Sequence, residues 1–115
     1  MKKLLMSVRG LGPKIAVITD ERNGAYIMDN SGAYRAPMYP DPAPPVNRTG
    51  AGDATASTTV AYIIKGLTPQ EALLRGMINA SSVVQGVGAQ AGLLTERQVE
   101  ALYAKRPKDF QMTTI

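Results

Sequence analysis

The sequence predicts an α/β fold made of a helix, a strand, a hairpin and three further helices. Apolar residues at positions 4, 5, 8 and 11 have helical spacing, whereas residues 15–19 form a short β-branched run typical of a strand. Glycine, proline and capping residues then delimit the later helices. About three strands are too few for a complete doubly wound sheet. The 115 residues therefore predict a single partial domain, 1–115.

The first half of the chain predicts one helix and three short strands. The helix should end at Gly10, since glycine stops helices. The apolar run 15–19 predicts a strand buried on both faces. Residues 25–29 and 33–38 flank Asn30-Ser31-Gly32, which is a good hairpin signal. Five prolines in residues 37–45 then predict a stiff, extended connector.

The second half predicts three helices. The first follows Gly52, runs to about Lys65 and stops at Gly66. Residues 68–71 (TPQE) begin the next with an N-cap, a proline at the first position and a capping-box glutamate. Residues 95–98 (TERQ) form a second capping box before the last helix. The expected inward residues of these last two helices are Ala72, Leu73, Leu74, Met77, Ile78, Val83, Val84, Val99, Leu102 and Tyr103. Gly86, Gly88 and Gly92 are expected to break up the middle helix.

Composition excludes several kinds of chemistry. The chain has no cysteine, which excludes disulfides, thiolate metal sites and thiol nucleophiles. It has no histidine, the commonest general base and metal ligand. Acid–base chemistry must therefore come from the nine carboxylates, from lysine or from tyrosine.

Charge and hydropathy argue against nucleic-acid and membrane partners. The net charge is +4, but the thirteen basic residues are scattered and aromatic residues make up only 5%. The one basic cluster, 105–108 (KRPK), is expected to be a solvated tail. The apolar run near Met1 breaks at Ser7 and Arg9, too soon for a signal peptide, and no stretch approaches a membrane span. We expect a cytoplasmic protein.

The most informative segment is Gly50-Ala51-Gly52-Asp53 at the start of a helix. A helix N-terminus attracts anions, and glycines let a phosphate approach the backbone. A carboxylate beside a phosphate is unfavourable unless it takes a proton from the attacking hydroxyl. The segment therefore indicates phosphoryl transfer, with backbone amides for the charge and Asp53 for the proton. The alternative is a helix-terminal charge after ordinary turn glycines.

The same residues resemble a known family. Residues 47–53 (NRTGAGD) are similar to the second signature of PfkB/ribokinase carbohydrate kinases, commonly DTxGAGD. Residues 14–19, 23–26, 79–82 and 86–89 resemble, in order, the family's late core strand, the turn after it, its adenine-side helix and its closing loop. The resemblance spans roughly residues 4–102 and corresponds to the C-terminal third or so of family members. It implies a ribokinase-like three-layer α/β/α fold, of which this chain is a C-terminal fragment.

The resemblance also implies a function and site residues. It implies ATP-dependent phosphoryl transfer to a carbohydrate hydroxyl, with Asp53 as base and the amides of Gly50, Ala51, Gly52 and Asp53 as an anion hole. ATP and Mg²⁺ are the implied cofactors, and a sugar or sugar acid is the substrate of the parent enzyme. The residues implied on the nucleotide side are Thr19, Gly24, Asn79 and Gly88, and no residue is implied as a metal ligand. From the residues alone, Thr19 is equally a plain strand former and Asn79 a hydrogen-bonded, partly buried asparagine.

Three departures separate the chain from the family pattern. Asn47 stands where an acidic residue is common, which weakens the case for a monovalent cation between this region and Gly86–Gly88. Glu21 stands where the family usually has glycine beside the nucleotide. The sugar-binding part and the upstream N-x-x-E motif, associated with magnesium and phosphate, are not in the sequence. We therefore expect little activity from this chain alone.

A non-catalytic module that oligomerises or binds nucleotide weakly is the alternative function. We expect a homo-oligomer, because the resemblance leaves a strand edge and apolar helix faces without the rest of the sheet. The interface is predicted to include residues 15–19 or the helix faces around Val60, Ile64, Met77 and Ile78.

Overall fold

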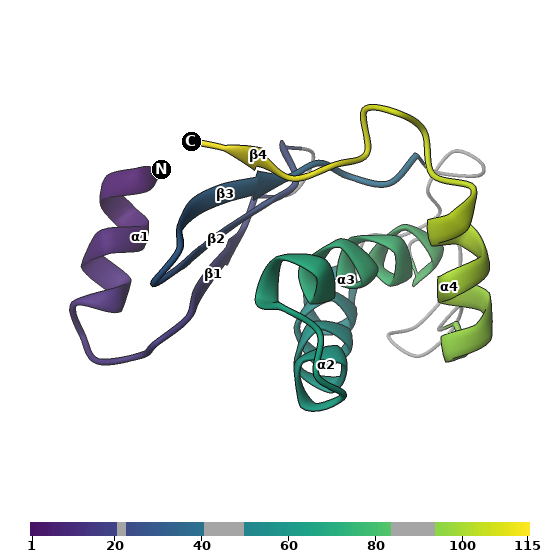
Figure 1. Cartoon of the computed structure of the whole chain (residues 1–115), viewed down its shortest axis with the longest axis horizontal. Helices are drawn as coiled ribbons and strands as arrows, with labels where there is room; N and C mark the ends of the chain where they lie inside the picture. Colours follow the sequence, from purple (N-terminus) through teal and green to yellow (C-terminus); the bar gives the residue numbers. More distant parts are fainter. Residues whose placement is uncertain (21–22, 41–49, 84–93) are drawn as a thin grey trace.

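A four-stranded sheet lies between two layers of helices in the computed structural model, which describes residues 1–20, 23–40, 50–83 and 94–115 (Figure 1). One helix packs on one face of the sheet, and the others lie on the opposite side. The elements are α1 (Lys2–Arg9), β1 (Ala16–Thr19), β2 (Ala25–Asp29), β3 (Gly32–Ala36), α2 (Ala51–Ile64), α3 (Pro69–Val83), α4 (Glu96–Ala104) and β4 (Thr113–Thr114). The predicted α/β/α layering is confirmed.

All neighbouring strands of the sheet are antiparallel, in the order β1-β2-β3-β4. The hairpin is confirmed, because β2 and β3 are joined by Asn30 and Ser31 with Asp29 opposite Gly32. The carboxylate of Asp29 accepts the backbone N–H and the hydroxyl of Ser31 at 2.8 and 2.6 Å. These bonds outweigh partial burial and lower the pKa of Asp29 below its ordinary value.

Side chains alternate between two apolar clusters on the two faces of the sheet. The larger cluster joins the sheet to α2, α3 and α4, with Ile27, Leu73 and Ile78 fully buried. The smaller cluster joins the other face to α1 through Leu5 and Met28. Leu5 is the one buried residue of α1. The other apolar residues of the helical pattern at positions 4, 5, 8 and 11 are not fully buried.

Strand β1 differs from the prediction of a strand buried on both faces. It lies at the edge of the sheet, and only Ala16 of its four residues is buried. The apolar run 15–19 is therefore half covered, with Val17 and Thr19 exposed. Apolar composition alone does not distinguish a central strand from an edge strand whose outer side is open.

Helices α2 and α3 approach so closely that only glycine fits at the crossing. A Cβ atom at Gly76 would lie 2.6 Å from the hydroxyl of Thr59 and 2.8 Å from the carbonyl oxygen of Thr55. The hydroxyls of Thr55 and Thr59 are turned back onto the carbonyls of Ala51 and Thr55 in their own helix, at 2.9 and 2.6 Å. Two polar side chains can therefore be buried where the helices meet.

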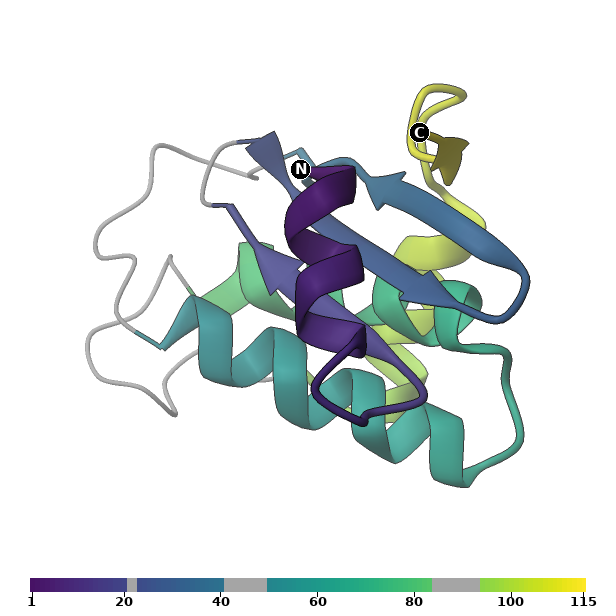
Figure 2. The ribbon, with the colours of Figure 1, turned by 90° about the vertical axis from the view of Figure 1, so that its left-hand side faces the viewer.

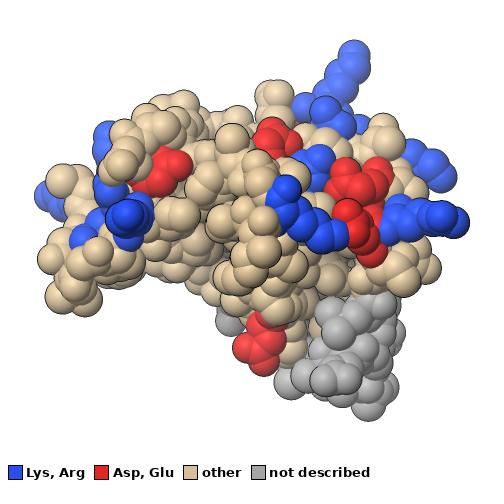
Figure 3. All heavy atoms as spheres, turned by 60° about the horizontal axis from the view of Figure 1, so that its bottom comes forward, with Lys and Arg blue, Asp and Glu red and all other residues tan. Residues whose placement is uncertain are grey.

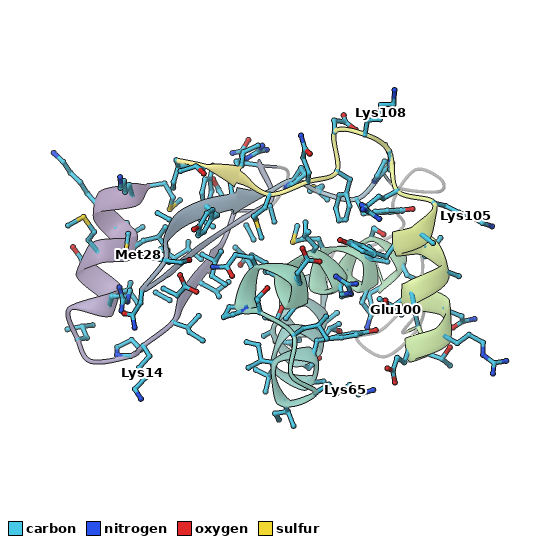
Figure 4. All side chains as sticks on the ribbon, in the orientation of Figure 1. Lys14, Met28, Lys65, Glu100, Lys105 and Lys108 are labelled. Carbon is cyan, nitrogen blue, oxygen red and sulfur yellow. The ribbon has the colours of Figure 1, made fainter. Side chains whose placement is uncertain are left out.

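Arg75 joins α3 to α4. Its guanidinium binds both carboxylate oxygens of Glu100 at 3.0 and 3.2 Å and one oxygen of Glu71 at 2.7 Å, and it stacks 3.7 Å from the ring centre of Tyr103. Figure 4 shows Glu100 between the two helices. The bond from Arg75 holds the pKa of Glu100 below its ordinary value, while burial and the charge of Glu100 raise the pKa of Tyr62 to about 12.

The helix boundaries agree with the predicted ends, with one difference in capping. Thr95 and Gln98 form the reciprocal capping box that was predicted for α4. At α3, the hydroxyl of Thr68 accepts the N–H of Glu71 at 3.2 Å, as expected of an N-cap. The carboxylate of Glu71 does not complete a box but accepts bonds from Arg75 and Tyr103. Hydrogen bonds to Arg75 and Tyr103 thus take the place of the capping bond that the local sequence predicts for Glu71.

The basic residues near the end of the chain are exposed, as expected of a solvated tail, and the segment that follows them is anchored on the sheet. Lys105, Arg106 and Lys108 are exposed as expected, although Arg106 stacks on Tyr103 at 4.1 Å. Phe110 is buried and packs edge-on against Tyr39, with ring centres 4.9 Å apart. Strand β4, which was not predicted, then pairs with β3 at the edge opposite β1.

Two predicted features fall partly or wholly outside the described residues. The proline connector is described only to Pro40, and the glycines expected to break up the middle helix lie in 84–93. None of the described helices has the length and apolar character that crossing a membrane requires.

We predict that Gly76→Ala destabilises the protein by about 1–3 kcal/mol, because the added methyl group overpacks the α2–α3 crossing. The measurement is the free energy of unfolding in urea. Gly10→Ala is the matched control, because a Cβ atom there meets its neighbours at 3.4 Å and φ is −61°. Equal stability of the two variants would contradict the close contact.

Candidate functional site

The start of α2 presents backbone N–H groups that have no partner within the helix. Gly50 is the N-cap in a left-handed conformation (φ 89°), which favours glycine. Its carbonyl oxygen accepts the N–H of Ala54 at 2.9 Å in the first bond of the helix. The N–H groups of Ala51, Gly52 and Asp53 therefore have no partner within α2 and point along its positive end. This end of α2 has the chemistry of an anion site.

Gly52 and Asp53 are both open to solvent at this helix end. A Cβ atom at Gly52 would meet no described residue within 4 Å, so packing among the described residues does not require a glycine there. Asp53 is exposed in the first turn. A carboxylate is thus accessible beside amides that have no partner within α2, as proton removal next to a bound phosphate would need.

A groove of about 520 Å³ separates α2 from β1. Thr19 and Gly52 both line it, so the structure brings together two residues that are 33 positions apart in the sequence. The other lining residues are Ile15, Val17, Thr55, Ala56, Thr59, Val60 and Ile63. The groove is therefore mainly apolar, with polar groups where β1 ends and α2 begins.

Gly24 has a backbone role in the turn after β1. Its φ is 93°, its carbonyl oxygen accepts the N–H of Asp20 at 2.8 Å, and a Cβ atom would lie 2.1 Å from the carbonyl oxygen of Ala36. Glycine is required at this position by the sheet itself. Its predicted place on the nucleotide side stays a prediction.

Asn79 is buried and its hydrogen bonds connect α3 to α2 and to the segment before α4. Its amide donates to the hydroxyl of Thr58 on α2 at 2.8 Å, and its side-chain oxygen accepts the N–H of Leu94 at 3.0 Å. This agrees with the interpretation of Asn79 as a hydrogen-bonded asparagine. It also lines a second groove, of about 310 Å³, beside the start of α4. Its role toward a nucleotide is not tested by these contacts.

The ends of several elements lie on one side of the molecule. Figure 2 shows that α2 begins, α3 ends and β1 ends on this side. The remaining predicted site position, Gly88, lies outside the described residues, as do Glu21 and Asn47. Of the predicted residues, Thr19 and Gly52 therefore line one groove, and Asn79 contacts α2 through the hydroxyl of Thr58.

Sequence reasoning missed Thr58 and Gly76, which position these groups. Thr58 binds Asn79, and Gly76 lets α2 lie against α3. The run Thr55-Ala56-Ser57-Thr58-Thr59 is an unusual concentration of small polar residues in a helix and is the signal that could have indicated a close helix contact. In the described parts of the chain, carboxylates do not gather in threes as they would around a metal ion.

Comparisons with known proteins agree with this arrangement. The profile of the pfkB family of carbohydrate kinases matches residues 1–96. A nucleoside kinase of Methanocaldococcus jannaschii, an archaeal member of the ribokinase family, is 25% identical with a TM-score of 0.76, and the match covers 80% of this chain and 30% of that chain. No sequence among the curated proteins matches the chain.

Two ribokinase structures with bound ligands share the fold. Ribokinase of Arabidopsis thaliana, complexed with ribose and ATP, is 23% identical with a TM-score of 0.78 over 87% of this chain and 32% of that chain. A putative ribokinase II of E. coli, in complex with ATP and Mg²⁺, is 20% identical with a TM-score of 0.77 over 87% of this chain and 33% of that chain. The chain spans about a third of the length of these relatives. The expected ribokinase-like fold is confirmed.

We predict that Asn79→Ala lowers the free energy of unfolding by about 1–3 kcal/mol, because it leaves the hydroxyl of Thr58 and the N–H of Leu94 without their partner. Denaturation in urea measures the loss. Ser57→Ala is the matched control on the exposed side of α2, where the hydroxyl makes only a 3.4 Å contact with the carbonyl of Ala54. If both variants have the same free energy of unfolding, the hydrogen bonds of Asn79 do not stabilise the contacts between α2, α3 and the segment before α4.

Proposed function

Because the chain belongs to the pfkB family of carbohydrate kinases, we propose that it is the nucleotide-binding and catalytic portion of an ATP-dependent sugar kinase. The observation that carries the proposal is the start of α2, where amides without a partner in the helix lie beside an exposed carboxylate. Amides and a base at one helix end are the two elements that phosphoryl transfer requires of a protein.

The proposed chemistry divides between the backbone and one side chain. Asp53 accepts the proton of the acceptor hydroxyl while the hydroxyl oxygen forms its bond to phosphorus and the bond to the departing ADP oxygen breaks. The N–H groups of Gly50, Ala51, Gly52 and Asp53 donate to the phosphoryl oxygens. The exposure of Gly52 supports this assignment, since no described residue lies within 4 Å of where its Cβ atom would be.

The nucleotide is proposed to lie across the ends of β1, α2 and α3. Thr19 is assigned to its phosphates or ribose, and its position with Gly52 on one groove supports this. Gly24, Asn79 and Gly88 complete the proposed nucleotide side. Asn79 would then have a double role, because its described hydrogen bonds already hold α2 and the segment before α4 in place.

ATP and Mg²⁺ are the proposed cofactors. When bound, ATP would supply the phosphoryl group and Mg²⁺ would neutralise the charge on its phosphates. The start of α2 fits a phosphate because its amides have no partner within the helix and Gly52 adds no side chain. A bound monovalent cation has less support, since Asn47 carries no charge.

The acceptor is proposed to be a sugar or a sugar acid. The matched Arabidopsis structure contains ribose and ATP. Because this chain covers only about a third of such structures, the acceptor contacts are assigned to the part that it does not match. The parent enzyme is proposed to work in the cytoplasm.

The second candidate function is a non-catalytic module that oligomerises or binds nucleotide weakly. The exposed edge of β1 and the apolar groove beside it favour this candidate, because both are suited to contact with another chain. Met77 and Ile78, which the sequence suggested for an interface, are buried in the core and are excluded. The kinase proposal requires phosphoryl transfer and the non-catalytic module does not. Steady-state kinetics and titration with ATP distinguish the two functions.

We predict that Asp53→Asn in a full-length relative carrying this segment lowers kcat by about 10²–10⁴ with little change in nucleotide affinity, because a general base acts in the transition state. Steady-state kinetics and ATP titration measure the two effects. Ser57→Ala, exposed on the same helix, is the control and should retain full activity. A loss of about tenfold or less would assign Asp53 a structural role.

We predict weak or absent ATP binding by the 115-residue chain alone, since Glu21 replaces a glycine beside the nucleotide and the magnesium-side motif is not in the sequence. Isothermal titration with Mg·ATP is the measurement, with a full-length relative titrated under the same conditions as control. A dissociation constant of a few micromolar would overturn this expectation.

A further inference from the structure

A cavity of about 650 Å³ lies between the start of α3, the end of α4 and the connection from α4 to β4, and we call it the α4 cavity. Figure 1 shows this connection, residues 105–112, passing over α3 on its way to the sheet. No described residue lines both the α4 cavity and the groove between β1 and α2. The α4 cavity is therefore separate from the candidate functional site.

The wall of the α4 cavity combines apolar and charged surface. Leu74 and Phe110 are buried and line it from the core, whereas Tyr103 and Met112 are half-buried and add apolar surface that solvent reaches. Arg106 adds a cation. Sites for small molecules typically measure about 300–1,000 Å³ and combine apolar walls with a few polar groups. The α4 cavity thus has the size and the chemistry to hold a small organic molecule.

Arg106 is held in place with one edge of its guanidinium free. Its Nη1 donates to the carbonyl oxygen of Tyr103 at 2.9 Å, and the guanidinium stacks 4.1 Å from the centre of the Tyr103 ring. Among the described residues, no acceptor binds its Nε or Nη2. These two groups form the edge of arginine that donates to both oxygens of a carboxylate or phosphate. Because the stack restrains this edge in advance, binding an anion costs less side-chain entropy.

The carboxylate that lines the α4 cavity is already compensated within the protein. Glu71 accepts the hydroxyl of Tyr103 at 2.8 Å and the guanidinium of Arg75 at 2.7 Å. Arg75 also lies 3.7 Å from the ring centre of Tyr103, so α3 fixes the ring on which Arg106 stacks. No carboxylate of the described residues forms an ion pair with Arg106. The charge left without a partner in the wall is therefore positive.

The segment around Arg106 adds further positive charge. Residues 105–109 (KRPKD) contain three basic residues and one acidic residue. In Figure 4, Lys105 and Lys108 point outward from the connection, which leaves Arg106 as the direct contact. Figure 3 shows basic side chains at the margin of this end of the molecule, with acidic side chains between them. The excess of positive charge on an anchored segment favours an anionic ligand.

We propose that the α4 cavity binds a small organic anion. Its carboxylate or phosphate group accepts hydrogen bonds from Nε and Nη2 of Arg106, and its apolar body lies against Tyr103 and Met112. Most of the wall belongs to residues 103–112, beyond the residues 1–96 that the family profile matches. The site is thus additional to the proposed nucleotide side and does not rest on it.

The first experiment titrates the ¹⁵N-labelled chain with four probes and follows its backbone amides by NMR. Phenyl phosphate and benzoate carry a ring and an anionic group, and they distinguish a phosphate ligand from a carboxylate ligand. We expect at least one of them to bind with a dissociation constant of about 0.1–3 mM and to shift amides in 103–112 and near Glu71. Benzyl alcohol lacks the charge and inorganic phosphate lacks the ring, so each should bind at least about tenfold more weakly.

Variants of Arg106 test the contact with the anionic group. Arg106→Gln removes the charge and should raise the dissociation constant of the bound probe at least about tenfold. Arg106→Lys keeps the charge but loses the two-pronged edge, so it should raise the constant at least about threefold. Arg97→Gln is the matched control, because Arg97 is exposed on the same helix and does not line the cavity. Thermal melts show whether each variant is folded.

Several outcomes would overturn the proposal. One is that neither phenyl phosphate nor benzoate shifts amides in 103–112 at about 10 mM. Equal binding of benzyl alcohol would remove the role of the charge, and equal binding of inorganic phosphate would remove the role of the apolar body. Equal effects of Arg106→Gln and Arg97→Gln would exclude Arg106 as the anchor. Amide shifts confined to 50–54 would place the anion at the start of α2 instead. No readout uses phosphoryl transfer, so failure here and failure of the proposed kinase function are distinguishable.

Discussion

The close approach of α2 and α3 is the constraint on which the rest of the structure depends. Gly76 supplies the space, and the threonines facing it keep their hydroxyls on their own helix backbone. Most residues of α3 are buried, so the positions of the neighbouring helices depend on their contacts with α3. Arg75 holds α4, and Asn79 holds both α2 and the chain before α4. A larger residue at this crossing would displace each of these partners.

This constraint also positions the candidate site. With α2 held against α3, its first turn lies beside the end of β1, so that Thr19 and Gly52 line one groove. The amides of that turn remain open because Gly50 begins the helix in a left-handed conformation and Gly52 adds no side chain. The same placement leaves the outer side of β1 and the surface of α2 uncovered within the described chain. The candidate site thus adjoins the part of β1 and α2 that is uncovered within the described chain.

Local sequence signals predicted where most helices and strands begin and end. Long-range contacts decided which side chains bind one another and which strands pair. The caps at Thr68 and Thr95, the hairpin turn and the glycine stops have short-range physical causes, and the structure follows them. Glu71 was assigned to a cap but is bound by Arg75 and Tyr103. Strand β4 was missed because its two threonines have no pattern of their own and depend on β3 for pairing.

The sequence by itself determined the fold family and the composition of the candidate site at the start of α2, because Gly50 to Asp53 are contiguous and their chemistry follows from a helix start. Only the tertiary structure decided that β1 is an edge strand, that Gly24 is required by the carbonyl of Ala36, and that Asn79 is buried among hydrogen-bond partners. The physical reason is distance along the chain. Burial and pairing depend on residues tens of positions away, and a single sequence carries no record of which distant segments meet.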